Sequence, residues 1–227
     1  MYKNALILFA KTPIPNFSKT RLINPFTAEQ AAEFYSASLK DIFNTMHRSS
    51  NFDLWIAIAP ENFDKNLFPL NTDSINNFFQ TGDDLGIRML NAFDELFKKG
   101  YKKIAIIGSD FPHIPVDAIK QTFNDLDSYE LVIGPAIDGG YYLIGSKKLY
   151  ESIFKDINWS TEKVYQQTID KAKQNNISVK NLQEEYDVDT VNEVIQLYLD
   201  LKEMDSSLIN FPVNVWQFLQ THKNIFL

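Results

Sequence analysis

A basic segment near the N-terminus offers one kind of chemistry. Lys11, Lys19 and Arg21 place three cations within residues 11–22, among prolines that restrict the loop. A guanidinium group matches phosphate oxygens with a planar fork, and an ammonium group gives a compact charge, so the segment indicates a phosphate-binding loop. A solvated surface loop is the other interpretation, and the segment has neither the P-loop nor the dinucleotide-binding glycine pattern.

Aspartates in two later segments offer metal binding. Asp110 follows an apolar run directly, where its carboxylate could hold Mg²⁺ or Mn²⁺ against a diphosphate. It could equally cap a helix that begins after Pro115. Asp187 and Asp189 point the same way on an extended backbone and could add a second metal ligand or an acid or base. Asp189 or Thr190 could instead cap the helix that follows.

A glycine-rich turn offers contacts to a sugar. Gly139 and Gly140 permit the close approach of a ligand, and Asp138 and Tyr141 beside them could bond to sugar hydroxyls or cover the ring. Asp-Gly is also a standard hairpin sequence, so a turn is expected in either case.

Three further residues have weaker support. Arg88, in a segment with two glycines, could reach a phosphate or pair with an acidic neighbour. Trp159 could face the ligand or the core, and Ser160 belongs to a Ser-Thr pair that could cap a helix. The histidines show no metal-ligand spacing, and the sequence contains no nucleophile elbow.

Alternating strands and helices would have to position these residues. Continuous apolar runs at residues 5–10 and 103–108 predict strands covered on both faces of a parallel sheet. The other predicted strands are residues 52–59, 130–134, 141–145 and 177–182. The predicted helices are residues 85–99, 116–126, 161–175 and 190–202, and one that begins at about Thr27, where Thr27 and Gln30 resemble a capping box. This alternation predicts an α/β fold with a mostly parallel sheet and helices on both faces, and polar segments that follow its strands should meet at one sheet edge.

Composition narrows the class of protein. The 227 residues are 44% hydrophobic, with a formal net charge of -7 and no cysteine, which suits a globular protein without disulfides or thiolate ligands. No long basic run is present, so nucleic acid is not an expected partner. No apolar run is long enough to cross a bilayer and the N-terminus lacks a secretory pattern, so we expect a cytoplasmic protein. We predict one domain over residues 1–227, with the aromatic tail 206–227 packed on its body, and leave the oligomeric state open.

The ordered set of motifs resembles a family of small bacterial glycosyltransferase-like proteins. That family has the GT-A, or nucleotide-diphospho-sugar transferase, fold and is often associated with arsenosugar biosynthesis. The motifs that carry the resemblance are residues 9–13, 19–22, 80–89, 108–112, 134–143, 159–161 and 187–190. Asn16 stands where the family commonly has glycine, Phe111 replaces a small residue, and residues 191–193 also depart, but the cations and acidic residues remain.

The resemblance implies a Rossmann-like sheet that binds a nucleotide-sugar, with its phosphates near Lys19 and Arg21. Asp110 matches the carboxylate that serves as a metal ligand in GT-A enzymes. Residues 187–190 are also similar to a motif of nucleotidyltransferases, including phospholactate guanylyltransferases, which favours Asp189 as a second metal ligand.

These expectations combine into one leading hypothesis: sugar transfer from a nucleoside-diphosphate sugar to a small-molecule acceptor, with Mg²⁺ or Mn²⁺ on Asp110 and Asp189. Catalysis is assigned to Asp138 and Asp189. Phosphate contacts are assigned to Lys11, Lys19, Arg21 and Arg88, and sugar contacts to Gly139, Gly140, Tyr141, Trp159 and Ser160. The alternative is a nucleotidyltransferase that joins an NTP to a phosphorylated small molecule, although the Gly-Gly-x-Ser-x-Arg loop of many such enzymes is missing. A non-catalytic nucleotide-binding domain is the third hypothesis.

Overall fold

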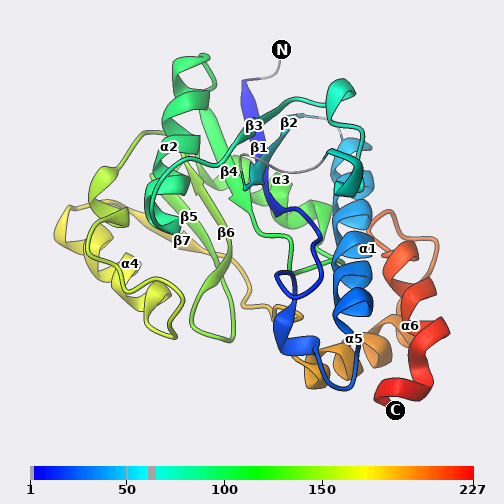
Figure 1. Ribbon diagram of the computed structural model, residues 1–227. Helices are drawn as coiled ribbons and strands as arrows, with labels where there is room; N and C mark the ends of the chain where they lie inside the picture. The colour runs from blue at the N-terminus through cyan, green and yellow to red at the C-terminus, as the bar shows by residue number, and fades with distance from the viewer. Residues whose placement is uncertain (1–2, 50, 61–64) are drawn as a thin grey trace.

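A mixed β-sheet forms the centre of the computed structural model, which describes residues 3–49, 51–60 and 65–227 (Figure 1). Among these residues the sheet has seven strands in the order β3-β2-β1-β4-β6-β5-β7. The strands are β1 (Asn4–Lys11), β2 (Asp53–Ala59), β3 (Asn77–Phe79), β4 (Lys103–Ile107), β5 (Leu131–Pro135), β6 (Tyr141–Ser146) and β7 (Val179–Asn181). The strand β3 was not predicted, because three residues are too few to show a hydrophobic period.

Strand directions follow from the lengths of the connections. β1 pairs in parallel with β2 and β4, and β2 pairs in parallel with β3. β6 is antiparallel to both β4 and β5, since only a short turn separates β5 from β6, and β7 returns parallel to β5. The predicted mostly parallel sheet is therefore confirmed, with one reversed strand.

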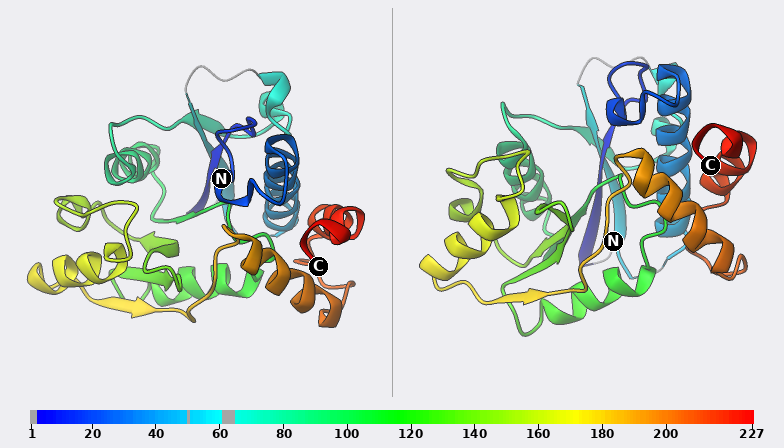
Figure 2. Two further views of the ribbon diagram at one scale, coloured as in Figure 1. Left: turned by 60° about the horizontal axis from the view of Figure 1, so that its bottom comes forward. Right: turned by 90° about the horizontal axis from the view of Figure 1, so that it is seen from below.

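Helices cover both faces of the sheet, as predicted (Figure 2). Successive residues of β1 alternate between the faces: Leu6 and Leu8 pack with α1 (Ala28–His47) and α3 (Val116–Asp125). Ile7 and Phe9 pack with α2 (Leu85–Lys98) and α4 (Val164–Gln174) on the other face. This double cover explains why the strand is a continuous apolar run.

Helix termini settle several alternatives left open by the sequence. The capping box at α1 is present, with the Thr27 side chain and Gln30 bonded to each other's backbone. Pro115 occupies the N-cap of α3, so Asp110 is not a helix cap. Thr190 is the N-cap of α5 (Val191–Glu203), and its backbone N–H donates to Glu193, which leaves the Asp189 side chain free of that duty.

Two boundaries differ from the prediction. The helix expected from residue 161 begins at Val164, because Thr161 bonds locally to the carbonyl of Asn158 and to the N–H of Lys163 in a turn. The strand expected over 177–182 is shortened to β7. Short 3-10 turns at Thr20–Leu22, Lys65–Leu67, Thr72–Ser74 and Glu151–Phe154 were not predicted.

The C-terminal segment contains a helix that the sequence analysis did not predict, α6 (Val213–Phe226). It packs against α1 and α5 around a third apolar cluster that includes Phe26, Phe34 and Phe218 (Figure 2). Asp41 on α1 accepts hydrogen bonds from the backbone N–H groups of Asn214 and Val215 and so bonds to the first turn of α6. No helix in the described part of the chain is long and apolar enough to cross a membrane.

Candidate active site

The polar segments predicted to converge do meet at the carboxyl edge of the sheet. A cavity of about 260 Å³, here called the basic cavity, is lined by Lys11, Arg21, Asp110 and other residues that follow β1 and β4. A second cavity of about 540 Å³, here called the acidic cavity, is lined by Asp138, Glu162, Asp187 and neighbours from the turns after β5 and before α4 and α5. Arg21, Leu85 and Asp189 line both cavities, so the two adjoin.

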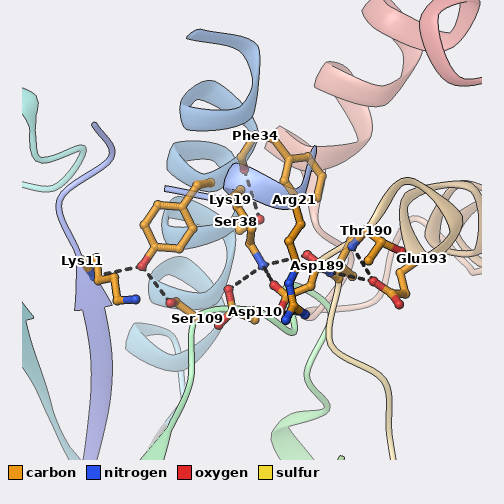
Figure 3. A network of polar contacts seen from close by, with 12 residues as sticks. Lys11, Lys19, Arg21, Phe34, Ser38, Ser109, Asp110, Asp189, Thr190 and Glu193 are labelled. Atoms are coloured by element: carbon orange, nitrogen blue, oxygen red, sulfur yellow. Dashed lines mark hydrogen bonds and ion pairs between the residues drawn. The ribbon is translucent and has the colours of Figure 1, made fainter. Parts of the chain in front are cut away.

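Lys19 lies between two of the predicted metal ligands (Figure 3). Its Nζ is 2.5 Å from Asp110 Oδ1 and 2.8 Å from Asp189 Oδ1, and it donates to the carbonyl of Val188 at 2.6 Å. An ammonium group has three donors, so these contacts use all of them. The predicted phosphate contact of Lys19 therefore requires one of these bonds to break.

The surroundings keep this lysine charged. Only 3% of the Lys19 side chain is exposed. Burial lowers its pKa, but the carboxylates of Asp110 and Asp189 raise it more, so the net pKa lies above the ordinary value. The pKa of Asp189 is raised by burial and lowered by Lys19 and Arg21, with a net lowering. The three groups form a charged, partly buried network.

Backbone geometry brings the two aspartates together from distant segments. The N–H of Val188 donates to the carbonyl of Asp110 at 2.9 Å, which joins the segment before α5 to the loop after β4. Lys19 reaches them from a left-handed backbone position, with φ 51°. Asn16 is also left-handed, with φ 66°, which fits its place at a position where the related family commonly has glycine.

The other three residues predicted to bind phosphate differ from Lys19 in their surroundings. Arg21 is 70% exposed, with Nη1 3.9 Å from Asp189 Oδ2, and it lines both cavities. Lys11 is exposed and lines the basic cavity. Arg88 donates from Nε to the carbonyl of Gly82 at 2.9 Å and is not among the residues that line either cavity. The structure thus brings Lys11 and Arg21 to the cleft and leaves Arg88 outside it.

Tyr35 is a site residue that the sequence analysis missed. Its hydroxyl accepts from the backbone N–H of Lys11 and bonds to Ser109 Oγ, each at 2.8 Å, so it links the ends of β1 and β4. Burial and then the nearby carboxylate of Asp110 raise the pKa of Tyr35 to about 12. In the sequence Tyr35 is one more large residue on the buried side of a helix, and nothing distinguishes it from a core tyrosine.

The acidic cavity gathers the other predicted carboxylates. Asp187 lines it together with Asp189, as expected for alternate residues on an extended backbone. Burial, then the carboxylates of Asp110 and Asp138, raise the pKa of Asp187 to about 8, so this carboxyl holds a proton at neutral pH. The two aspartates consequently differ in charge although they face the same space.

The predicted sugar-binding residues lie around the acidic cavity. Asp138 Oδ1 accepts from the N–H of Gly140 at 2.8 Å and so closes the turn between β5 and β6. Gly139 has φ 86°, and a Cβ there would lie 2.1 Å from the carbonyl oxygen of Glu162, so only glycine fits. The predicted residues that line the cavity are Gly140, Tyr141, Trp159 and Ser160. Gly139 does not line it; its carbonyl instead accepts from the N–H of Tyr165 and so joins the turn to the first turn of α4.

Lys19 uses Oδ1 of Asp110 and Oδ1 of Asp189, so it is the second oxygen of each carboxylate that fits a divalent cation arriving with a phosphate ligand. Asp110 and Asp189 are 41% and 37% exposed at their side chains and both line the basic cavity. Magnesium is commonly held by one or two carboxylates, with waters and substrate phosphates completing the shell. Within the described residues, no group of three or more His, Asp or Glu side chains could hold a metal ion by itself.

Comparison with solved structures establishes the class of fold. The structure matches a protein from Desulfovibrio desulfuricans G20, described provisionally as a nucleotide-diphospho-sugar transferase, with a TM-score of 0.90 and 31% sequence identity over 100% of this chain and 97% of that one. It also matches 4-diphosphocytidyl-2C-methyl-D-erythritol synthase from Anaerococcus prevotii DSM 20548, with a TM-score of 0.59 and 11% identity over 88% and 96% of the two chains. The fold is therefore the Rossmann-like α/β fold of nucleotide-diphospho-sugar transferases, as the motif resemblance implied.

The family assignment follows from sequence. Residues 42–161, more than half of the chain, match the model of a family described as uncharacterized proteins conserved in bacteria (DUF2064). The chain belongs to this family.

A third structural match is the manganese complex of Rv0371C from Mycobacterium tuberculosis H37Rv, with a TM-score of 0.52 and 12% identity over 86% and 96% of the chains. The comparison with curated proteins gives no match, and the link to arsenosugar biosynthesis stays a prediction.

Proposed function

We propose that the protein is a transferase that takes a nucleoside-diphosphate sugar as donor and passes the sugar to a small-molecule acceptor. One observation carries the proposal: Asp110 and Asp189 converge beside a cavity with exposed cations, and a second cavity adjoins it. The first arrangement suits a diphosphate with its metal, and the second provides room for an acceptor.

The residues divide the work between binding and proton transfer. Lys11 and Arg21 are placed to bind the diphosphate oxygens from the basic cavity. Asp110 and Asp189 would hold Mg²⁺ or Mn²⁺, which neutralises charge on the leaving diphosphate when bound. Asp138, which lines the acidic cavity, is the candidate base for the acceptor. Asp189 is bonded to Lys19 with a lowered pKa, which suits it to charge stabilisation better than to proton abstraction.

The relatives support a transferase and leave two reactions to compare. The relative from Desulfovibrio desulfuricans bears the description of a nucleotide-diphospho-sugar transferase, and manganese is bound in the complex of Rv0371C. The likeness to a CMP-2-keto-3-deoxy-manno-octonic acid synthetase bound to CTP favours the second candidate, nucleotidyl transfer from an NTP. The two reactions release different products, a nucleoside diphosphate and pyrophosphate.

A donor panel tests the proposal. Thermal unfolding is measured with UDP-, GDP-, dTDP- and ADP-linked sugars and with the four NTPs, each with and without Mn²⁺, because a ligand that binds the native state raises its stability. We expect a metal-dependent rise with at least one nucleotide-sugar, and release of the nucleoside diphosphate in the presence of an acceptor mixture. Stabilisation by NTPs alone, with pyrophosphate release, would replace the glycosyltransferase proposal by the second candidate.

A further inference from the structure

The two adjoining cavities carry opposite charge. The basic cavity is lined by three cations, Lys11, Lys19 and Arg21, against the two carboxylates of Asp110 and Asp189. The acidic cavity has one cation, Arg21, which lies at the boundary. Its acidic residues are Asp138, Glu162, Asp187 and Asp189. A charged ligand group therefore meets a different field in each half of the cleft.

The negative charge of the acidic cavity is not neutralised by neighbours. Within the described residues, neither Asp138 nor Glu162 forms an ion pair with a lysine or an arginine, and Asp187, which holds a proton at neutral pH, is not counted in the negative charge. Asp189, by contrast, is paired with Lys19 and faces Arg21. The unpaired carboxylates lie on the walls away from the basic cavity, where an acceptor would sit.

The same cavity has an apolar wall that is fixed in position. Trp159, Tyr141, Leu85 and Val164 line it. The indole of Trp159 fills the space beside Gly86, where a Cβ would lie 2.3 Å from the ring, so the ring packs directly on the first turn of α2. Glu162 is held close by the turn at Gly139, whose carbonyl accepts from the N–H of Tyr165 at 2.8 Å.

We propose that the acceptor is an uncharged or positively charged, hydroxyl-bearing small molecule with an apolar face, and that phosphorylated or carboxylated acceptors are rejected. This proposal rests on the transferase function proposed above. An anionic group placed beside like charges in a partly enclosed site is costly, whereas a hydroxyl can donate to the carboxylates and an apolar face can cover Trp159. The cavity volume of about 540 Å³ suits a small molecule.

The proposed transfer forms one bond and breaks another. The acceptor hydroxyl oxygen forms a bond to the anomeric carbon, and the bond from that carbon to the diphosphate oxygen breaks. The electron pair leaves with the nucleoside diphosphate into the basic cavity, and the hydroxyl proton passes to the carboxylate of Asp138. This step needs no further reactant.

The sign of the field can be measured on the free protein, without knowing the substrate. In the variant Trp55→Phe/Trp216→Phe, Trp159 is the one remaining tryptophan, and its fluorescence is quenched with caesium and with iodide. The quenching constant of each ion is divided by its quenching constant for free N-acetyltryptophanamide. If that variant does not fold, the difference between the native chain and Trp159→Phe gives the same signal. We expect caesium to quench at least ~2-fold better than iodide after normalisation, because the cavity attracts cations. Equal or stronger quenching by iodide would overturn the proposal.

Matched charge reversals assign the effect to the cavity. Glu162→Lys should remove the preference for caesium, whereas Glu203→Lys, the same change at an exposed position at the far end of α5, should leave it unchanged. Equal effects of the two variants would show that overall charge, and not the cavity, governs the quenching, and would contradict the proposal.

Acceptor pairs then test the substrate class. With the donor found by the panel, transfer is compared between methyl glucoside and glucose 6-phosphate and between glycerol and glycerol 3-phosphate. The unphosphorylated member of a pair should react at least ~10-fold faster, and Glu162→Lys should narrow the ratio. Equal or faster reaction of the phosphorylated members overturns the proposal. Failure of every donor to bind would instead defeat the proposed function. The quenching result would still report the sign of the electrostatic potential in the acidic cavity.

Discussion

At the scale of single residues, Lys19 and its two aspartates decide how the site can work. The lysine supplies a fixed positive charge where the family resemblance implies a divalent cation, and it uses one oxygen of each carboxylate. The sequence predicted that these three residues would lie at one sheet edge, because Lys19 and Asp110 follow predicted strands and Asp189 precedes a predicted helix. It could not predict the partner of Lys19, because that depends on a left-handed backbone angle in a loop without regular structure.

Replacement of Lys19 should destabilise the protein and make it dependent on divalent cations. Lys19→Met leaves two carboxylates facing each other, and we expect a loss of about 2–4 kcal/mol in the free energy of unfolding, somewhat less than for a fully buried pair because both aspartates are partly exposed. Urea unfolding with and without Mg²⁺ measures this, and Mg²⁺ should restore part of the loss. Lys98→Met, which breaks an exposed pair with Asp94, is the control and should cost under ~1 kcal/mol. Failure of Mg²⁺ to stabilise Lys19→Met would argue against a cation site here.

Loss of a carboxylate at the proposed metal position should affect activity more than folding. Asp110→Asn keeps the shape of a side chain that is 41% exposed, but it removes one of the two charges that face the buried Lys19, so we expect a folded protein whose loss of stability is no greater than that of Lys19→Met. Metal-dependent activity should fall at least ~100-fold, because charge on the leaving group is no longer stabilised. Asp117→Asn on α3, an exposed aspartate in a surface pair, is the matched control. Retained activity in Asp110→Asn would remove this residue from the proposed site.

At the scale of elements, the long periodic segments could be predicted and the short or irregular ones could not. The strands β1 and β4 are continuous apolar runs, and α1 begins at a capping box that is legible in the sequence. β3 has three residues and is defined by its pairing with β2, which no local pattern records. α6 has aromatic residues on several sides because it fits against two helices, so its apolar stripe is indistinct.

The turn between β5 and β6 depends on a glycine at position 139. Gly139→Ala combines a left-handed backbone with a clash against Glu162, so the turn should shift away from α4. Gly100 is also left-handed, with φ 97°, but apart from its chain neighbours no atom of the described residues lies within 4 Å of a Cβ there. Gly100→Ala should therefore cost only ~1–2 kcal/mol of stability, and Gly139→Ala should cost more and also reduce activity. Calorimetry and a donor-release assay compare the two variants. Similar losses of stability would show that the backbone at Glu162 moves aside for the added Cβ with little loss of stability.

At the scale of the whole molecule, the third apolar cluster attaches the C-terminal helix to two elements that serve the site. α1 provides Tyr35, and Asp189 directly precedes Thr190, the N-cap of α5. α6 packs against both helices, so it stabilises the relative position of these residues without reaching the cleft. The tail was predicted to pack on the body from its aromatic content, while the helix itself was not predicted.

A buried histidine predicts how global stability depends on pH. Burial lowers the pKa of His113 from 6.5 to about 4, and its Nδ1 has no hydrogen-bond partner among the described residues. The unfolded chain therefore binds a proton below about pH 6.5 that the native protein does not, so stability falls as the pH drops from about 6.5 to about 4, by at most about 3 kcal/mol from this group. Urea unfolding across this range should show a smaller decline in His113→Asn than in the parent, whereas the exposed His47→Asn should decline like the parent. Parallel curves for all three proteins would contradict this account.

Tyr35 has a consequence for how a nucleotide would be received. Its buried hydroxyl joins Lys11 to Ser109, so the ends of β1 and β4 cannot separate without leaving polar atoms unbonded, at a cost of ~1–3 kcal/mol. In the free protein these two hydrogen bonds consequently hold the ends of β1 and β4 at the mouth of the basic cavity in one arrangement. Little of the binding energy would be consumed in reorganising these two loops. Tyr35→Phe should then weaken nucleotide affinity by widening the range of loop positions at the cavity that Tyr35 lines.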